Sequence, residues 1–337
     1  MYACGYRRGL WLDLSRQNWD QTGPRPVAWS AWYPASPRSS RMIPRMAWGL
    51  FDLGEVDPDQ ALAHGGPWPV VLLSHGTGGS AESLGWLARE LACRGSVVLA
   101  AQHHGNTSLE PYRAEGFLCW WERARDLSGL LTEASGPHVF GAALDLQRVA
   151  AVGYSLGAHT VLSLGGAVTS MDLLQRWQDS VGAVERGPRE FPDLAGRLPS
   201  LFESSAVFRA SWSRQGDSNQ DPRVRAVVAI APPPPVRAFT HGSIQAMTVP
   251  VTLMAGGADL EAPLSVGAAW LQSLNPNFAL HEVGGSVGHH SFLGPPSATG
   301  QRDQPELFAD ATEVARDEVH RRVLSLVDRA CNAEARR

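Results

Sequence analysis

The sequence predicts an α/β fold in which helices cover both faces of a mostly parallel sheet, with a helical insertion in the second half of the chain. Short apolar runs typical of buried strands recur along the chain, and helix-like patterns separate several of them. Gly153-Tyr154-Ser155-Leu156-Gly157 stands between one such run and the helix pattern 157–164, as expected for a sharp strand-to-helix turn. At 337 residues with 44% hydrophobic content, the chain fits one large domain, 1–337.

The expected elements follow in chain order. Two opening strands, 9–14 and 27–33, are expected to pair antiparallel. The segment 38–68 is rich in Pro, Gly and Met, and we expect a long irregular excursion near the rim of the site. Further strands are expected at 69–74, 96–101, 148–152, 224–231, 249–255 and 278–283. Helices are expected at 80–93, 112–134, 157–164 and 305–333.

The segment 168–223 is too long for a simple connection between a helix and the next strand. Its amphipathic stretches, 171–177 and 198–208, predict helices. We therefore expect residues 168–223 to form a helical cap over the active site.

Ser155 is the expected nucleophile. The glycines on either side suit a turn so tight that a Cβ would clash with the backbone. Such a turn presents the serine hydroxyl at the carboxyl end of the sheet, above the first turn of a helix. The free N–H groups and the dipole of that helix end favour developing negative charge.

Asp259 and His289 are the expected partners of Ser155. Each follows a predicted strand, so both lie on loops at the same edge of the sheet as the serine. A serine hydroxyl becomes a good nucleophile when a neutral imidazole takes its proton and a carboxylate holds that imidazole in place. The order Ser, Asp, His along the chain fits this arrangement. Glu261 is the alternative acid.

The loop His75-Gly76-Thr77-Gly78-Gly79 follows the strand 69–74 and precedes a helix pattern. In such sites one oxyanion donor is the N–H of the residue after the nucleophile, and the other comes from this loop. We therefore expect the backbone N–H groups of Leu156 and Thr77 to form the oxyanion hole. The side chains expected near the substrate pocket are His75, Tyr154 and His290.

Several motifs in a fixed order resemble a known family. They are Ala31-Trp32-Tyr33-Pro34, Leu73 to Gly79, His103-His104-Gly105-Asn106-Thr107, Arg125-Asp126-Leu127-Ser128, Gly153 to Gly157, and Gly288-His289-His290-Ser291-Phe292-Leu293. Together they resemble the dienelactone-hydrolase-like branch of the α/β-hydrolases, which also holds the platelet-activating-factor acetylhydrolases. The resemblance runs from about Gly9 to about Leu293. It implies an α/β-hydrolase fold, with His289 in the catalytic position and His290 where the family has an aromatic residue.

The chain departs from the family pattern at several positions. The dienelactone hydrolases proper use a cysteine nucleophile where this chain has Ser155, so their lactone substrate does not carry over. Gln102 replaces a frequent Asp, and Ala158 replaces a frequent Gly. In the acetylhydrolases the acid can follow the strand that corresponds to 224–231, but the loop after that strand contains no carboxylate here. Asp259 is then the natural source of the acid.

These features predict a serine carboxylic-ester hydrolase that acts through an acyl-enzyme on short-acyl or small esters, with no metal or organic cofactor. An amidase, a thioesterase or an acyltransferase would use the same triad. An alternative from another class is a catalytically inactive binding protein with a hydrolase fold, which an aryl-ester assay would distinguish.

Composition narrows the remaining function classes. The net charge is −4 without a basic run, so we expect neither nucleic-acid binding nor attraction to anionic membranes. No apolar run reaches the length of a membrane span. The first residues lack a signal-peptide pattern, so we expect a cytoplasmic protein, or a secreted one if the chain is a trimmed mature form. The sequence leaves open the oligomeric state and whether Cys4 and Cys331 form a disulfide.

Overall fold

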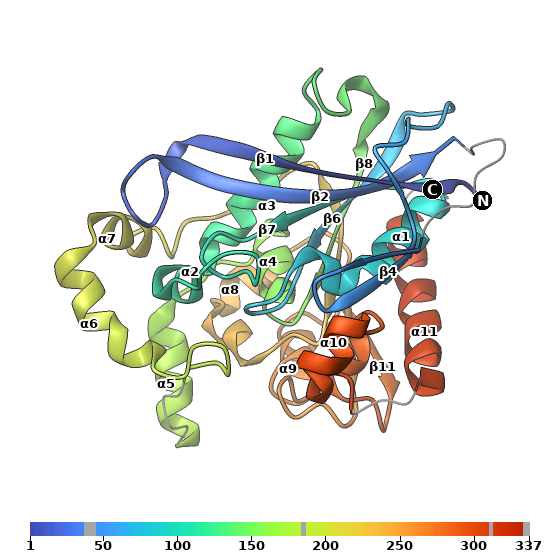
Figure 1. The fold of residues 1–337 in the computed structure, drawn as a ribbon. Helices are drawn as coiled ribbons and strands as arrows, with labels where there is room; N and C mark the ends of the chain where they lie inside the picture. Colours follow the sequence, from blue (N-terminus) through green and yellow to red (C-terminus); the bar gives the residue numbers. More distant parts are fainter. Residues whose placement is uncertain (37–44, 183–186, 310–312, 333–337) are drawn as a thin grey trace.

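The computed structural model describes residues 1–36, 45–182, 187–309 and 313–332, and within them the chain forms a central nine-stranded sheet (Figure 1). The strands lie across the sheet in the order β11-β10-β9-β8-β6-β7-β2-β1-β5. Their bounds are β1 (Ala3–Gln17), β2 (Pro24–Ala35), β5 (Asp57–Pro58), β6 (Trp68–Ser74), β7 (Val97–Gln102), β8 (Leu144–Tyr154), β9 (Val224–Ile230), β10 (Val251–Gly256) and β11 (Ala279–Gly284).

The strands from β7 to β11 run parallel, whereas β2 pairs antiparallel with both β1 and β7. Leu72 at the centre of β6 lies opposite Leu99 of β7 and Ala151 of β8, and all three are fully buried. Apolar runs without alternation are therefore buried on both faces of the sheet. The mostly parallel sheet and the antiparallel opening strands expected from the sequence are confirmed.

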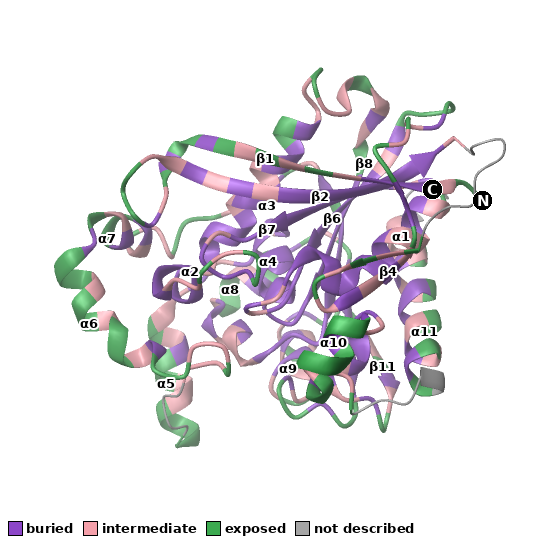
Figure 2. Ribbon diagram, viewed as in Figure 1, coloured by how far each residue is buried: buried purple, intermediate pink, exposed green. Residues whose placement is uncertain are grey.

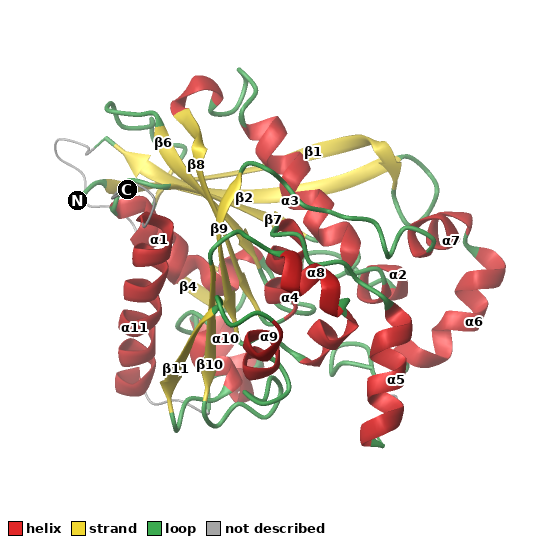
Figure 3. Ribbon diagram, turned by 180° about the vertical axis from the view of Figure 1, so that it is seen from behind, coloured by secondary structure: helices red, strands yellow, loops and turns green. Residues whose placement is uncertain are grey.

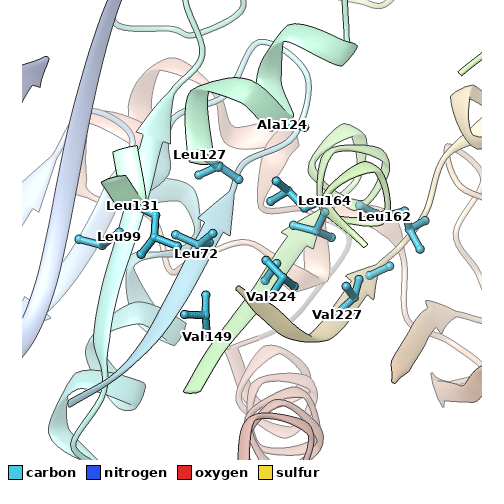
Figure 4. Packing of buried hydrophobic residues seen from close by; sticks show 14 of the residues in the cluster. Leu72, Leu99, Ala124, Leu127, Leu131, Val149, Leu162, Leu164, Val224 and Val227 are labelled. Carbon is cyan, nitrogen blue, oxygen red and sulfur yellow. The ribbon is translucent and has the colours of Figure 1, made fainter. Parts of the chain in front are cut away.

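Helices cover both faces of the sheet (Figures 1 and 3). One face packs against α3 (Trp121–Ala134), α4 (Leu156–Leu164), α8 (His241–Ala246) and α9 (Ala268–Leu274). The other face packs against α1 (Gly85–Cys93) and α11 (Glu313–Asn332). Figure 4 shows the first layer, where Leu127 and Leu131 of α3 lie over Leu72 and Leu99. The doubly wound arrangement expected from the sequence is confirmed.

Several expected helices differ from the structure, and the helix expected at 80–93, for example, begins with a 3-10 turn at Ala81–Leu84. The segment 112–134 contains two helices, α2 (Ala114–Leu118) and α3, because Cys119 leaves the helical conformation at φ −95° and ψ 65°. The closing helix, expected from residue 305, is preceded by a short 3-10 turn at Pro305–Leu307, and α11 begins at Glu313. Residues 310–312 and 333 lie outside the described residues.

The expectation of an irregular excursion at 38–68 is wrong for its central part. Residues 37–44 lie outside the described residues, and β3 (Arg45–Trp48) pairs with β4 (Phe51–Glu55) as a hairpin. Phe51 and Leu53 are buried in the core that contains α1. β3 has no fully buried residue and β4 has two, so strands this short give too little alternation to recognise in the sequence.

The segment 168–223 contains α5 (Met171–Val181), α6 (Leu194–Ser204) and α7 (Ala206–Trp212), which project from one side of the sheet (Figures 1 and 3). Much of their surface is exposed (Figure 2). They pack on α2 and the start of α3 through a small apolar cluster that includes Phe117, Trp121 and Phe208. The backbone N–H of Asp221 donates to the Leu164 carbonyl at 3.0 Å, so the two ends of the insertion meet.

The four cysteines carry free thiols, so Cys4 and Cys331 are not joined by a disulfide in this structure. The thiol of Cys4 interacts instead with the thiol of Cys93 at the end of α1. This contact raises the pKa of Cys4 and lowers the pKa of Cys93.

Candidate active site

Ser155 lies in a strained turn between β8 and α4, at the carboxyl edge of the sheet. Its backbone has φ +53° and ψ −123°, a conformation that costs a residue with a side chain about 1–3 kcal/mol. A Cβ on Gly153 would lie 2.0 Å from the Gly157 carbonyl oxygen, and a Cβ on Gly157 would lie 2.1 Å from the Ser74 carbonyl oxygen. Only glycine fits at these two positions. Because the backbone of Gly157 packs directly on the end of β6, this contact fixes the position of the Ser155 turn.

The imidazole of His289 joins Ser155 to Asp259. Its Nε2 lies 3.0 Å from Oγ of Ser155, and its Nδ1 lies 2.8 Å from Oδ2 of Asp259. Because an ionised carboxylate only accepts hydrogen bonds, Nδ1 carries the hydrogen and Nε2 accepts from the serine hydroxyl. The exposed fractions are 9% for Ser155, 3% for Asp259 and 7% for His289, so solvent competes little for these contacts. A base in this position is able to take the hydroxyl proton of an attacking serine.

The carboxylate of Asp259 is fixed by its own loop. Its Oδ1 accepts the backbone N–H groups of Glu261 at 3.0 Å and Ala262 at 2.7 Å. These bonds leave Oδ2 directed at the imidazole of His289. The turn after β10 therefore determines both the position and the orientation of the carboxylate.

Glu261, the alternative acid, lies on the other side of the imidazole. Its Oε2 is 3.9 Å from Nε2 of His289, the nitrogen that faces Ser155, and its Oε1 is 3.2 Å from Nε2 of His290. The hydrogen bond from His290 lowers the pKa of Glu261, although partial burial opposes this shift. Because Asp259 rather than Glu261 contacts Nδ1, the geometry favours Asp259 as the orienting acid.

The loop after β6 passes directly beside Ser155. A Cβ on Gly76 would lie 3.2 Å from the Cβ of Ser155. Among the described residues, no group accepts a hydrogen bond from the backbone N–H of Thr77 or from that of Leu156. Leu156 is the first residue of α4, where a backbone N–H has no acceptor within the helix. Two unused donors next to a serine are what an oxyanion site requires.

Two of the side chains expected near the substrate pocket, His75 and Tyr154, are buried. His75 is 1% exposed; its Nδ1 lies 2.7 Å from the Gly76 carbonyl oxygen, and its Nε2 accepts the N–H of His103 at 3.4 Å. His75 therefore supports the loop instead of lining a pocket, which corrects that expectation. Tyr154 is also buried, and its hydroxyl donates to the carbonyl oxygen of His289 at 3.0 Å.

The insertion reaches this region through residues Arg189 and Glu190. A Cβ on Gly78 would lie 2.6 Å from Cγ of Glu190. The hydroxyl of Tyr112 donates to the carbonyl oxygen of the same Gly78 at 2.8 Å. Arg189 lies 3.4 Å from Glu190 and 3.9 Å from Glu306. Glu190 precedes α6 and lies against the loop that carries Thr77.

A buried polar network behind the loop contains two residues, Asn106 and Arg123, that the sequence analysis does not place in the site. Oδ1 of Asn106 accepts the N–H of Gly78 at 2.7 Å, and the guanidinium of Arg123 donates to the carbonyl of His75. Asn106 belongs to one of the motifs that carry the family resemblance, which is the only sequence signal for it. Arg123 lies in an ordinary helix pattern that gives no sign of its burial.

The described ranges of the chain contain neither a metal-binding cluster nor a membrane-spanning helix. No cluster of three or more His, Cys, Asp or Glu side chains there is arranged to hold a metal ion. No helix in those ranges combines the length and the apolar character needed to cross a membrane.

Comparisons with known proteins agree with this architecture. The family model described as platelet-activating factor acetylhydrolase, isoform II, matches residues 45–116, which include the loop 75–79. A search of curated proteins finds no match. The structure is similar to that of a ferulic acid esterase from Streptomyces cinnamoneus, with a TM-score of 0.62 and 17% sequence identity over 98% of this chain and 89% of that chain.

At this level of identity, the structural similarity establishes the fold alone. The family match covers part of the chain and agrees with the resemblance expected from the motifs. The chain is therefore an α/β-hydrolase in fold, and it is similar to the platelet-activating factor acetylhydrolases of isoform II.

Proposed function

We propose that this chain is a serine carboxylic-ester hydrolase that works through an acyl-enzyme intermediate. The single observation that carries the proposal is the imidazole of His289, which contacts Ser155 at 3.0 Å and Asp259 at 2.8 Å. The three residues come from loops after three different strands. In this arrangement each ring nitrogen of His289 has the partner that general-base catalysis requires.

In the acylation half, Oγ of Ser155 forms a bond to the ester carbonyl carbon while its proton passes to Nε2 of His289. The carbonyl electron pair moves onto the oxygen, which the N–H groups of Thr77 and Leu156 stabilise. Asp259 stabilises the imidazolium and keeps its orientation. When the carbonyl re-forms, the bond to the alcohol breaks, and the alcohol leaves with the proton from His289.

In the deacylation half, water replaces the alcohol. His289 takes a proton from the water as the water oxygen attacks the acyl carbon, and the same donors stabilise the second oxyanion. Collapse of this intermediate releases the carboxylic acid and returns the proton to Ser155. No step needs a metal ion or an organic cofactor.

The proposed substrate class follows from the insertion, residues 168–223, which we assign as a helical cap over the active site. The contact between Glu190 and Gly78 supports this role, because it puts the insertion beside the proposed oxyanion loop. A wall at this position would limit the room for the acyl group. Short-acyl or otherwise small esters are the proposed substrates.

The test is hydrolysis of aryl acetate by the intact protein and by Ser155→Ala. We expect the variant to lose several powers of ten in turnover while it keeps the fold. An organophosphate should label Ser155 alone, as read by peptide mass spectrometry. Labelling of a different serine, or a tenth of the activity left in the variant, would contradict the assignment.

The two neighbouring histidines provide a matched pair of variants. His289→Ala should abolish hydrolysis, whereas His290→Phe should keep most of it because His290 contacts Glu261 and not Ser155. Parallel assays with aryl amides, thioesters and an acceptor alcohol distinguish an amidase, a thioesterase and an acyltransferase. Binding of an ester without turnover of any of these would instead indicate an inactive hydrolase fold.

A further inference from the structure

Arg123 of α3 is a fully buried guanidinium directly behind the proposed oxyanion loop. Its side chain is among the largest that the protein buries completely, with 1% of the residue exposed. It donates hydrogen bonds to the carbonyl of His75, to Oγ of Ser74 at 3.4 Å, to Oδ1 of Asn106 at 3.3 Å and to Oγ1 of Thr160 at 3.1 Å. One rigid, planar group therefore contacts two different segments of the site.

The first of these segments is the loop that carries Thr77. The carbonyl of His75, which accepts from Arg123, lies two residues before Thr77. Asn106 accepts from both Arg123 and the backbone N–H of Gly78, the residue after Thr77. Arg123 thus holds the loop on both sides of the proposed donor.

The second segment is the nucleophile helix α4. Oγ1 of Thr160 accepts from Nε of Arg123 and donates to the carbonyl of Leu156 at 3.2 Å. Thr160 lies one turn after Leu156, whose N–H is the other proposed donor. The side chain of Arg123 consequently connects the two backbone groups that an oxyanion would contact.

Among the described residues, no carboxylate contacts the guanidinium of Arg123 directly. All four acceptors are neutral, and no described Asp or Glu forms an ion pair with this guanidinium. The carboxylate of Asp126 instead contacts the side chains of Arg16, Arg25 and His103. Burial lowers the pKa of Arg123 to about 9, so the group stays positively charged at neutral pH.

We propose that Arg123 is a positioning residue for the oxyanion site, one that fixes the spacing of the Thr77 and Leu156 N–H groups and directs a buried positive charge toward the carbonyl oxygen. This inference rests on the proposed esterase function. As the bond from Ser155 Oγ to the carbonyl carbon forms, the carbonyl electron pair moves onto the oxygen. The fixed donors and the buried charge stabilise this state more than the neutral ester, so they act on kcat more than on KM.

The test compares Arg123→Lys with Arg16→Lys. Both arginines are buried, but Arg16 contacts Asp13, Glu122 and Asp126 instead of the oxyanion loop. For Arg123→Lys we expect kcat to fall about 10- to 100-fold with KM changed by less than about threefold. Affinity for an aryl trifluoromethyl ketone, which forms a tetrahedral adduct with Ser155, should fall by the same factor as kcat/KM. Arg16→Lys should leave kcat unchanged even if its melting temperature falls.

The outcomes separate this inference from the proposed function. A folded Arg123→Lys variant with unchanged kcat, or with reduced kcat and undiminished affinity for the ketone, overturns the role of Arg123 alone. A wild-type protein that hydrolyses no ester and resists organophosphate labelling overturns the proposed function itself. If Arg123→Lys does not fold, Thr160→Val removes one acceptor of the guanidinium and should lower kcat and ketone affinity together by a few-fold. Unchanged values for both would overturn the inference.

Discussion

The hydroxyl of Tyr154 donates a hydrogen bond to the main-chain carbonyl of His289 at 3.0 Å, and the two rings lie 5.0 Å apart. Tyr154 is the last residue of β8 and precedes Ser155 directly. This buried contact therefore links the turn at Ser155 to the loop that carries His289. Any change in this contact should alter the distance between Oγ and Nε2.

Tyr154→Phe keeps the ring and removes this hydrogen bond. One hydrogen bond of about 1 kcal/mol corresponds to about a fivefold change, so we expect kcat/KM for an aryl acetate to fall by roughly that factor. Tyr33→Phe is the matched control, because it removes the 2.7 Å bond from a buried tyrosine to the Gln60 carbonyl far from Ser155. If the two variants lose the same amount of activity, the link from Tyr154 to His289 has no role in catalysis.

Asp259→Asn should lower kcat about ten-thousandfold, because an amide at this position favours the wrong imidazole tautomer. Glu261→Gln should change kcat by less than about tenfold, since its carboxylate faces the other ring nitrogen at 3.9 Å. Steady-state kinetics on an aryl acetate measure both effects. If the two variants exchange these effects, Glu261 would be the orienting acid.

Residue Glu190 should limit the length of the acyl chain. Glu190→Ala removes the side chain that lies against Gly78, and we expect kcat/KM to rise for octanoyl relative to acetyl aryl esters. Phe202→Ala in α6 is the control, because Phe202 packs on Phe208 and Trp212 within the insertion. A wild-type preference that increases up to palmitoyl would contradict a walled pocket.

Stability should fall in acid partly because His320 is buried in its neutral form. Its ring stacks on Trp86 at 3.6 Å, and its Nε2 lies 3.0 Å from the Leu293 carbonyl oxygen. Burial lowers the pKa of His320 to about 3, whereas an unfolded histidine titrates near about 6.5. Between these two values the unfolded chain binds a proton that the folded chain does not. Stability is therefore lost as the pH falls from about 6.5 toward about 3.

His320→Phe keeps a ring on Trp86 and removes this titration. We expect the free energy of unfolding to decline less steeply between pH 6 and pH 4, by at most about 1.4 kcal/mol per pH unit. Urea denaturation at a series of pH values measures the slope. A variant with the wild-type slope would show that His320 is not the group responsible.

The sequence predicts elements well where apolar runs are continuous or where a motif demands one backbone shape. The strand 69–74 is buried on both faces, so its pattern is unambiguous. The turn at Ser155 is equally clear because both flanking glycines are required by contacts under 2.5 Å. The hairpin of β3 and β4 and the break at Cys119 escape prediction, because each depends on packing against α1 or α7 that no local pattern reveals.

Sequence patterns indicate some residues of the proposed site and not others, for the same reason. Ser155, Asp259 and His289 can be proposed from the sequence, because each follows a predicted strand and their order is the one found in the α/β-hydrolase fold. The burial of His75 and the contacts of Arg123 cannot, since they depend on how α3 lies behind β6. From the sequence, a histidine in a glycine-rich loop is expected near the pocket. The structure shows that His75 is buried instead.

The hydrogen bond between Asp221 and Leu164 closes the base of the insertion. The chain leaves the scaffold after α4 and returns to it before β9 at neighbouring positions, so the insertion 168–223 begins and ends at one place on the sheet. A transplanted replacement would have to cover Phe117 and Trp121, which the native insertion buries. Changes in length or sequence within this insertion would therefore leave β8 and β9, and with them the turn at Ser155, in place.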